Sequence, residues 1–187
     1  MSNSEYKYSE VVDFKYNRDN LLKVVEQTVK EEGFLEKSVP ISTFKNAQRP
    51  FSPTKILEVL GLKFGDSIFG IYITSLTIAC LRPFERSAIH VDRNFDNTPT
   101  MRAFNVPVTL CNNVTMNWYN VRPNGKIKTL KSAGGWEIPG LSLDQSVLCY
   151  SKKADKPFVV NPSSFHDIVN EGNQIEIIIS IRSGLYK

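Results

Sequence analysis

Two short segments in the first third of the chain carry apolar residues at helical spacing. In residues 18–32 the apolar positions recur every three or four residues and form one stripe, which predicts an amphipathic helix. Residues 53–60 predict a second, short helix, because Pro53 suits a first helical position and Gly61 follows the last apolar residue. The stretch 34–51 contains two prolines and predicts irregular chain with short extended pieces.

From residue 67 onward the pattern changes to short β-branched and aromatic runs. The run SIFGIYITSLTIAC is too long for one flat strand, and Gly70 marks a possible bend within it. Further strands are predicted at 86–91, 102–110, 114–121, 146–150, 157–160 and 175–182, with Gly, Pro and Asn turn signals between them. Many short strands with such turns favour a sandwich or barrel, and the helices would pack outside one of its sheets.

The length supports one domain, because 187 residues leave no room for a second independent core. We therefore expect a single domain over residues 1–187. It would be mainly β, with a helical N-terminal support region at 1–66 and the β core at 67–187.

Composition excludes several classes of protein. The net charge of +4 is too small to indicate nucleic-acid binding, and no apolar run is long enough to span a membrane. The polar N-terminus lacks the apolar core of a signal peptide. Three widely spaced cysteines without a CxxC pair indicate reduced thiols, so we expect a cytoplasmic protein. No phosphate-loop, dinucleotide or serine-hydrolase motif is present.

Histidine is the scarcest reactive residue, with only His90 and His166 in the chain. His90 and Asp92 lie two apart in a predicted strand, so their side chains would project from the same face. Two imidazoles and one carboxylate form the facial ligand set that holds Fe(II) and leaves positions open for other ligands. The spacing alone is equally compatible with two unrelated, structurally satisfied histidines.

The residues around this motif favour the metal hypothesis. Residues 67–184 resemble the iron(II)/2-oxoglutarate-dependent dioxygenases, and the segments 101–119 and 166–182 are similar to strand pairs of small bacterial or phage-type members. The resemblance implies a double-stranded β-helix, also called a jelly roll or cupin-like core. It also implies Fe(II) bound by His90, Asp92 and His166, with 2-oxoglutarate as co-substrate and O₂ as oxidant.

The residue that would bind the far carboxylate of 2-oxoglutarate departs from the family pattern. Relatives carry a base on the strand after the distal histidine, but Glu176 stands near that position here. Arg182 is the basic residue on that predicted strand, and Ser180 would lie on the same face. The alternative candidates are Asn105, Tyr119 and Arg102.

Two tryptophans, Trp118 and Trp136, are candidates for the lining of a substrate pocket. Trp136 is the stronger of the two, because it lies in a glycine-rich segment with less core to enter. The sequence favours a small-molecule, amino-acid or peptide substrate and leaves its identity and the oligomeric state open. Two alternatives remain: a metal-binding cupin-like protein that does not use 2-oxoglutarate, and a jelly-roll module without metal.

Overall fold

The computed structural model describes residues 8–31, 41–44, 53–92, 102–131 and 137–183. Within these ranges, the first third of the chain forms two helices, α2 (Arg18–Glu31) and α3 (Pro53–Val59), as predicted. The strands are β1 (Ser9–Val11), β2 (Ile41–Phe44), β3 (Ser67–Ile68), β4 (Ile71–Tyr72), β5 (Ser75–Leu81), β6 (Ile89–His90), β7 (Ala103–Pro107), β8 (Val114–Val121), β9 (Lys128–Lys131), β10 (Glu137–Leu141), β11 (Ser146–Lys153), β12 (Phe158–Val160), β13 (His166–Asn170) and β14 (Glu176–Arg182). A short 3-10 turn, η2 (Leu143–Gln145), precedes β11. The chain is mainly β, as the hydrophobic pattern predicts.

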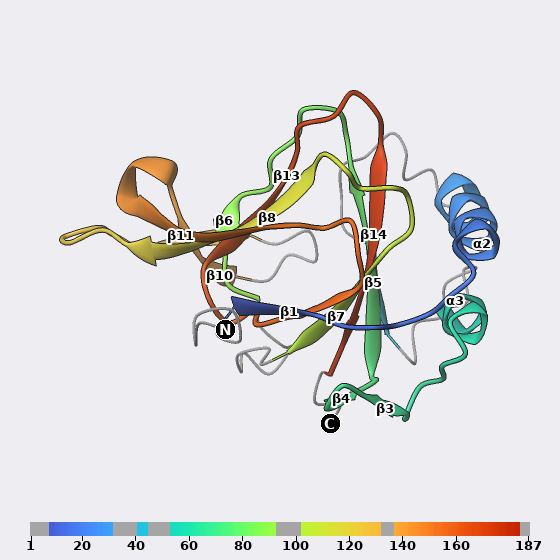
Figure 1. Cartoon of the computed structure of the whole chain (residues 1–187). Helices are drawn as coiled ribbons and strands as arrows, with labels where there is room; N and C mark the ends of the chain where they lie inside the picture. Colours follow the sequence, from blue (N-terminus) through green and yellow to red (C-terminus); the bar gives the residue numbers. More distant parts are fainter. Residues whose placement is uncertain (1–7, 32–40, 45–52, 93–101, 132–136, 184–187) are drawn as a thin grey trace.

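Two six-stranded antiparallel sheets form the body of the molecule (Figure 1). The first sheet has the order β1-β12-β7-β14-β5-β2, and the second has the order β11-β8-β13-β6-β10-β9. A small hairpin of β3 and β4 precedes β5. Gly70 lies between these two strands at φ 74, a conformation that glycine adopts without steric cost, so the bend predicted there is confirmed.

The first sheet separates two apolar layers because side chains alternate along its strands. In β14, Ile177, Ile179 and Ile181 pack with the apolar stripes of α2 and α3 in one core cluster. Ile178, between them, packs with residues of the second sheet in another cluster. The helices therefore cover the outer face of the first sheet, where Figure 1 shows them beside β14 and β5, and the inner face is left for contacts with the second sheet.

β1, β9 and β10 lie outside the predicted strand segments, whereas β2 is one of the short extended pieces predicted for 34–51. The strand pattern of β9 and β10 is weak, because KTLK is mostly polar and EIPGL contains Pro and Gly. β1 and β2 come from the N-terminal region and pair with β12 and β5 as the two edges of the first sheet. The N-terminal region thus contributes strands as well as helices. Within the described ranges, no helix is both long and apolar enough to cross a membrane.

Candidate metal centre

Two neighbouring strands of the second sheet bring the two histidines together. His90 ends β6 and His166 begins β13, and the two residues are direct partners in the antiparallel register. The prediction that Asp92 shares a strand with His90 is wrong, because β6 ends at His90. The Asp92 backbone is nevertheless held, since its N–H donates to the Pro162 carbonyl at 2.9 Å. Asp92 therefore turns toward the histidines from the chain that follows the strand.

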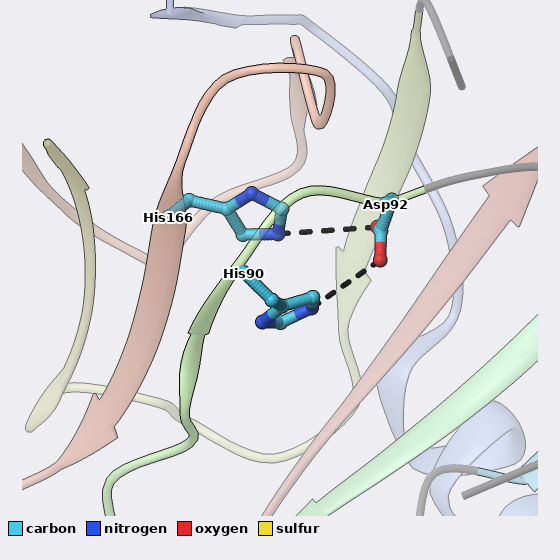
Figure 2. Close-up of side chains that lie close together, drawn as sticks. All are labelled: His90, Asp92 and His166. Carbon is cyan, nitrogen blue, oxygen red and sulfur yellow. Dashed lines mark ion pairs between the residues drawn. The ribbon is translucent and has the colours of Figure 1, made fainter. Parts of the chain in front are cut away.

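The three side chains converge on one point, as Figure 2 shows. One ligand atom from each of His90, Asp92 and His166 lies within 4.8 Å of the other two. Nε2 of His90 is 3.3 Å from the Asp92 carboxylate, and Nε2 of His166 is 3.9 Å from it. The structure thus assembles the ligand set that the sequence suggested.

Each imidazole is oriented through its other nitrogen. Nδ1 of His90 lies 2.8 Å from the Ala88 carbonyl oxygen, and Nδ1 of His166 lies 2.8 Å from the Ser164 carbonyl oxygen. A carbonyl can only accept, so Nδ1 carries a proton in both rings, and Nε2 is the nitrogen of each ring that faces Asp92. Such a contact fixes the tautomer and ring orientation that metal-ligating histidines need.

Arg182 places a positive charge beside the carboxylate of Asp92. Its Nη2 lies 2.9 Å from Oδ2 of Asp92. Burial alone would raise the pKa of Asp92, but Arg182 and the two histidines outweigh it and hold that pKa well below its usual range. Burial, together with the neighbouring His90, lowers the pKa of His166 to about 4. Asp92 is therefore ionised and His166 neutral at neutral pH, which are the states in which both bind metal.

A cavity of about 400 Å³ opens beside the triad between the two sheets. Three polar residues of the first sheet line it side by side, because Ser180 on β14 pairs with Thr77 on β5 and with Asn105 on β7. We call Thr77, Ser180 and Asn105 the polar row. Arg182 follows two residues beyond Ser180, lines the same cavity, and donates from Nε to the Ser180 hydroxyl at 3.2 Å. Three of the five predicted co-substrate residues therefore face this cavity.

The other two candidates lie elsewhere. The Tyr119 hydroxyl donates to Asp167 at 3.0 Å, and Tyr119 is not among the residues that line the cavity. Arg102 is half-exposed, and its Nη2 lies 4.0 Å from the Glu10 carboxylate. The sequence alone does not show which face of a strand turns inward, so it could not place these side chains in advance.

Glu176 does not face the cavity, although it precedes Ile178 and Ser180 on the same strand. Its carboxylate accepts hydrogen bonds from the Thr109 hydroxyl and, at 3.1 Å, from the Cys111 backbone N–H. Glu176 therefore does not contribute its carboxylate to the lining of the cavity.

The tryptophans do not extend the site. Trp118 is fully buried beside Tyr8 and Tyr150, whose ring centroids lie 6.0 Å and 5.5 Å from its own. Its indole N–H donates to the Asn161 carbonyl, and it does not line the cavity. Trp136 lies outside the described residues. The substrate-pocket role of Trp118 therefore has no geometric support here.

Sequence reasoning missed Thr77 and a buried acid beside the distal histidine. Thr77 could have been found, because small or polar residues alternate with apolar ones in SLTIACL. Asp167 is fully buried behind His166, where it accepts from Asn117 Nδ2 at 2.8 Å and from Arg86 Nη1 at 3.1 Å. No pattern distinguishes this acid, because its partners come from other strands.

The comparisons with known proteins concern the fold. No protein-family model matches the sequence, and no curated protein matches it. The structure is similar to that of EctD from S. alaskensis with 2-oxoglutarate and 5-hydroxyectoine, at TM-score 0.50 and 12% identity, covering 97% of this chain and 75% of that chain. The viral collagen prolyl hydroxylase of Paramecium Bursaria Chlorella virus-1 aligns at TM-score 0.47 and 13% identity, over 99% of this chain and 100% of that chain. The non-heme alpha ketoglutarate dependent carbocyclase SnoK aligns at TM-score 0.46 and 10% identity, over 99% and 88%.

These neighbours are 2-oxoglutarate-dependent oxygenases. At such low identity, the likeness to EctD establishes the fold alone. The predicted double-stranded β-helix is thereby confirmed.

Proposed function

We propose that the protein is a non-haem Fe(II) oxygenase that couples the oxidative decarboxylation of 2-oxoglutarate to the hydroxylation of a second substrate. The observation that carries the proposal is the convergence of His90, Asp92 and His166 within 4.8 Å beside a cavity. Two neutral imidazoles and one carboxylate suit Fe(II), and this ligand set leaves coordination positions for a chelating co-substrate and O₂.

The donor chemistry of the three residues fits such a metal. Nε2 is the nitrogen that each ring offers to a metal, because both Nδ1 atoms are committed to backbone carbonyls. Asp92 would offset part of the metal charge. When bound, Fe(II) supplies the electrons that activate O₂. The balanced reaction converts a substrate C–H, O₂ and 2-oxoglutarate into a C–OH, succinate and CO₂.

The remaining residues would bind and orient the organic ligands. Arg182 and Ser180 present a guanidinium and a hydroxyl to the cavity, a pair suited to a carboxylate of 2-oxoglutarate. Asn105 lies beside Ser180 and could donate from its amide nitrogen to the same group. The apolar remainder of the cavity would keep water away from the reacting atoms.

Substrate-independent release of CO₂ from 1-¹⁴C-labelled 2-oxoglutarate tests the proposal, together with succinate formation. We expect Fe(II)-dependent release by the wild-type protein and background release by Asp92→Ala. Asp13→Ala is the matched control, because Asp13 is an exposed acid far along the chain from the site. Release that is equal in wild type and Asp92→Ala would contradict the proposal.

One observation favours a second candidate, a metal-binding cupin-like protein that does not use 2-oxoglutarate. Arg182 is paired with Asp92 at 2.9 Å, so the base predicted for the co-substrate already contacts a metal ligand. In that case the protein would bind a divalent metal through the same three residues but would release no CO₂ with any added substrate.

A further inference from the structure

The cavity beside the triad has a polar end and an apolar end. Along β13 the inward positions step from His166 to Ile168, about 7 Å apart. Ile168 pairs with Met116 on β8, and across the cavity Ile178 pairs with Ala79 on β5. With Leu81, these residues line the part of the cavity beyond the polar row, and we call them the inner apolar half: Ala79, Leu81, Met116, Ile168 and Ile178.

Ala79 gives this half its space. The other residues of β5 are buried, but Ala79 is only partly buried because its side chain ends at Cβ and borders the cavity. Its neighbours on the same face are Thr77 and Leu81, both larger. A ligand group can therefore enter between the two sheets at this position.

The walls of the inner apolar half offer no partner to a charged group. Their side chains are aliphatic or thioether, and the backbone groups of β5, β14, β8 and β13 are paired in ladders. Glu85, Arg86 and Ser87 also line the cavity. Glu85 accepts from the Arg82 backbone N–H at 2.7 Å, Arg86 is bound to Asp167, and the Ser87 hydroxyl accepts from the Ile168 backbone N–H at 3.0 Å. Burying an unpaired charge there would be costly, whereas burying an alkyl group is favourable.

Asn105 marks the boundary between the two ends. Its Oδ1 is buried and has no hydrogen-bond partner among the described residues. A carboxylate cannot satisfy this oxygen because both groups only accept. A ligand O–H or N–H placed beside it would form the missing hydrogen bond.

We infer that the second substrate carries a small, uncharged, branched aliphatic group that occupies the inner apolar half, with an O–H or N–H group beside Asn105. This inference rests on the proposed function, because the bound molecule is a second substrate only if the protein is an oxygenase. The preference for aliphatic over charged ligands follows from the apolar residues that line this part of the cavity. It excludes substrates whose reacting end is a carboxylate or an ammonium group.

Methyl NMR of Met116 tests this preference directly. The chain has three methionines, so labelling with [¹³C-methyl]methionine gives a simple spectrum, and Met116→Leu identifies the cavity signal. The probe is 4-methylpentan-1-ol, compared with pentanedioate and pentane-1,5-diamine. We expect a saturable shift of the Met116 signal with the alcohol alone. Stronger binding of either charged probe, or no response to the alcohol, would overturn the inference.

A cavity-filling substitution locates the binding. Ala79→Leu should weaken binding of the alcohol about tenfold or more, in line with the effect of adding bulk to an apolar pocket. Ala79→Val makes the same test with less bulk if Ala79→Leu does not fold, and Val11→Ile adds a methylene at an exposed position as the control. Unchanged binding in a folded Ala79 variant would place the alcohol elsewhere and contradict the inference. Because the titration needs neither iron nor 2-oxoglutarate, its failure leaves the proposed function standing, and the converse also holds.

Discussion

The Asp92 carboxylate collects the contacts on which the site depends. One of its oxygens lies near His90, and the other lies near Arg182 and His166. A metal ion bound here would share this carboxylate with Arg182. The guanidinium would then both hold the ligand carboxylate in place and remain within reach of the polar row through Ser180. Arg182 is thus the residue at which the two candidate functions differ.

Replacing Arg182 separates these functions. If Arg182 binds 2-oxoglutarate, Arg182→Gln should raise the co-substrate concentration needed for half-maximal succinate formation by roughly ten- to a hundredfold, because a charge-assisted hydrogen bond is lost. Arg182→Lys should recover part of this loss, since it keeps the charge without the two-pronged geometry. A requirement that stays at the wild-type level in Arg182→Gln would show that the residue serves only Asp92.

At the scale of single elements, β13 connects the site to the outer face of the second sheet. Its inward side chains, His166 and Ile168, line the cavity, while Asp167 points the other way. Asp167 accepts hydrogen bonds from Asn117 and Tyr119 of β8 and from Arg86, which precedes β6. The acid therefore ties together the strand of the distal histidine, its neighbour, and the segment that leads to His90.

Removing this buried acid should destabilise the fold. Asp167→Ala loses three hydrogen bonds and leaves the Asn117 amide without its partner, so we expect the free energy of unfolding to fall by about 1–3 kcal/mol. The expected loss of stability is modest because Arg86 is partly exposed and stays hydrated. Urea unfolding measures the change, with Glu171→Ala as a control at an exposed acid just after β13. Equal urea midpoints for Asp167→Ala and the wild type would show that the hydrogen bonds of Asp167 contribute nothing to stability.

Elements with a strong hydrophobic pattern could be predicted from the sequence, and elements with a weak pattern could not. The stripe in residues 18–32 and the runs that became β5, β8 and β14 gave clear signals, because each buries apolar side chains on at least one face. β6 has only two residues and β10 contains Pro139 and Gly140, so neither carries a periodic pattern. These weak strands pair through backbone hydrogen bonds that composition does not record. They nevertheless lie beside His90, where β10 pairs with β6.

For the whole molecule, the helices and the site lie on opposite faces of the first sheet. One face of β5, β7 and β14 packs under α2 and α3, and the other lines the cavity. The metal triad could be inferred from two histidines and one acid. The polar row could not, because Thr77, Asn105 and Ser180 become neighbours only through strand register. Residue types can suggest a ligand set, but only topology shows which side chains share a cavity.

The three cysteines report on this packing. Cys149 is exposed, whereas burial raises the pKa of Cys80 to about 11 and that of Cys111 to about 12. At pH 7.5 we expect one thiol per chain to react rapidly with Ellman's reagent and the other two to react only after unfolding. Rapid reaction of two or three thiols in the folded protein would contradict the packing described.

The same thiols set the sign of an alkaline effect on stability. In the unfolded chain a thiol ionises at about pH 8.5, but the folded protein keeps Cys80 and Cys111 protonated to higher pH. The unfolded state then holds fewer protons, so the free energy of unfolding should fall as the pH rises from about 8.5 toward 11. Urea unfolding at pH 7.5 and pH 10 measures this loss, and equal midpoints would contradict it.

Anaerobic titration of the protein with Fe(II) and 2-oxoglutarate tests the central claim most directly. Chelation of the metal by the 2-oxo acid gives a weak visible charge-transfer band. We predict that this band saturates at one iron per wild-type chain and is lost in His166→Ala, while Asp13→Ala behaves as the wild type. No band at saturating 2-oxoglutarate, or an undiminished band in His166→Ala, would contradict the assignment of an Fe(II)/2-oxoglutarate centre to His90, Asp92 and His166.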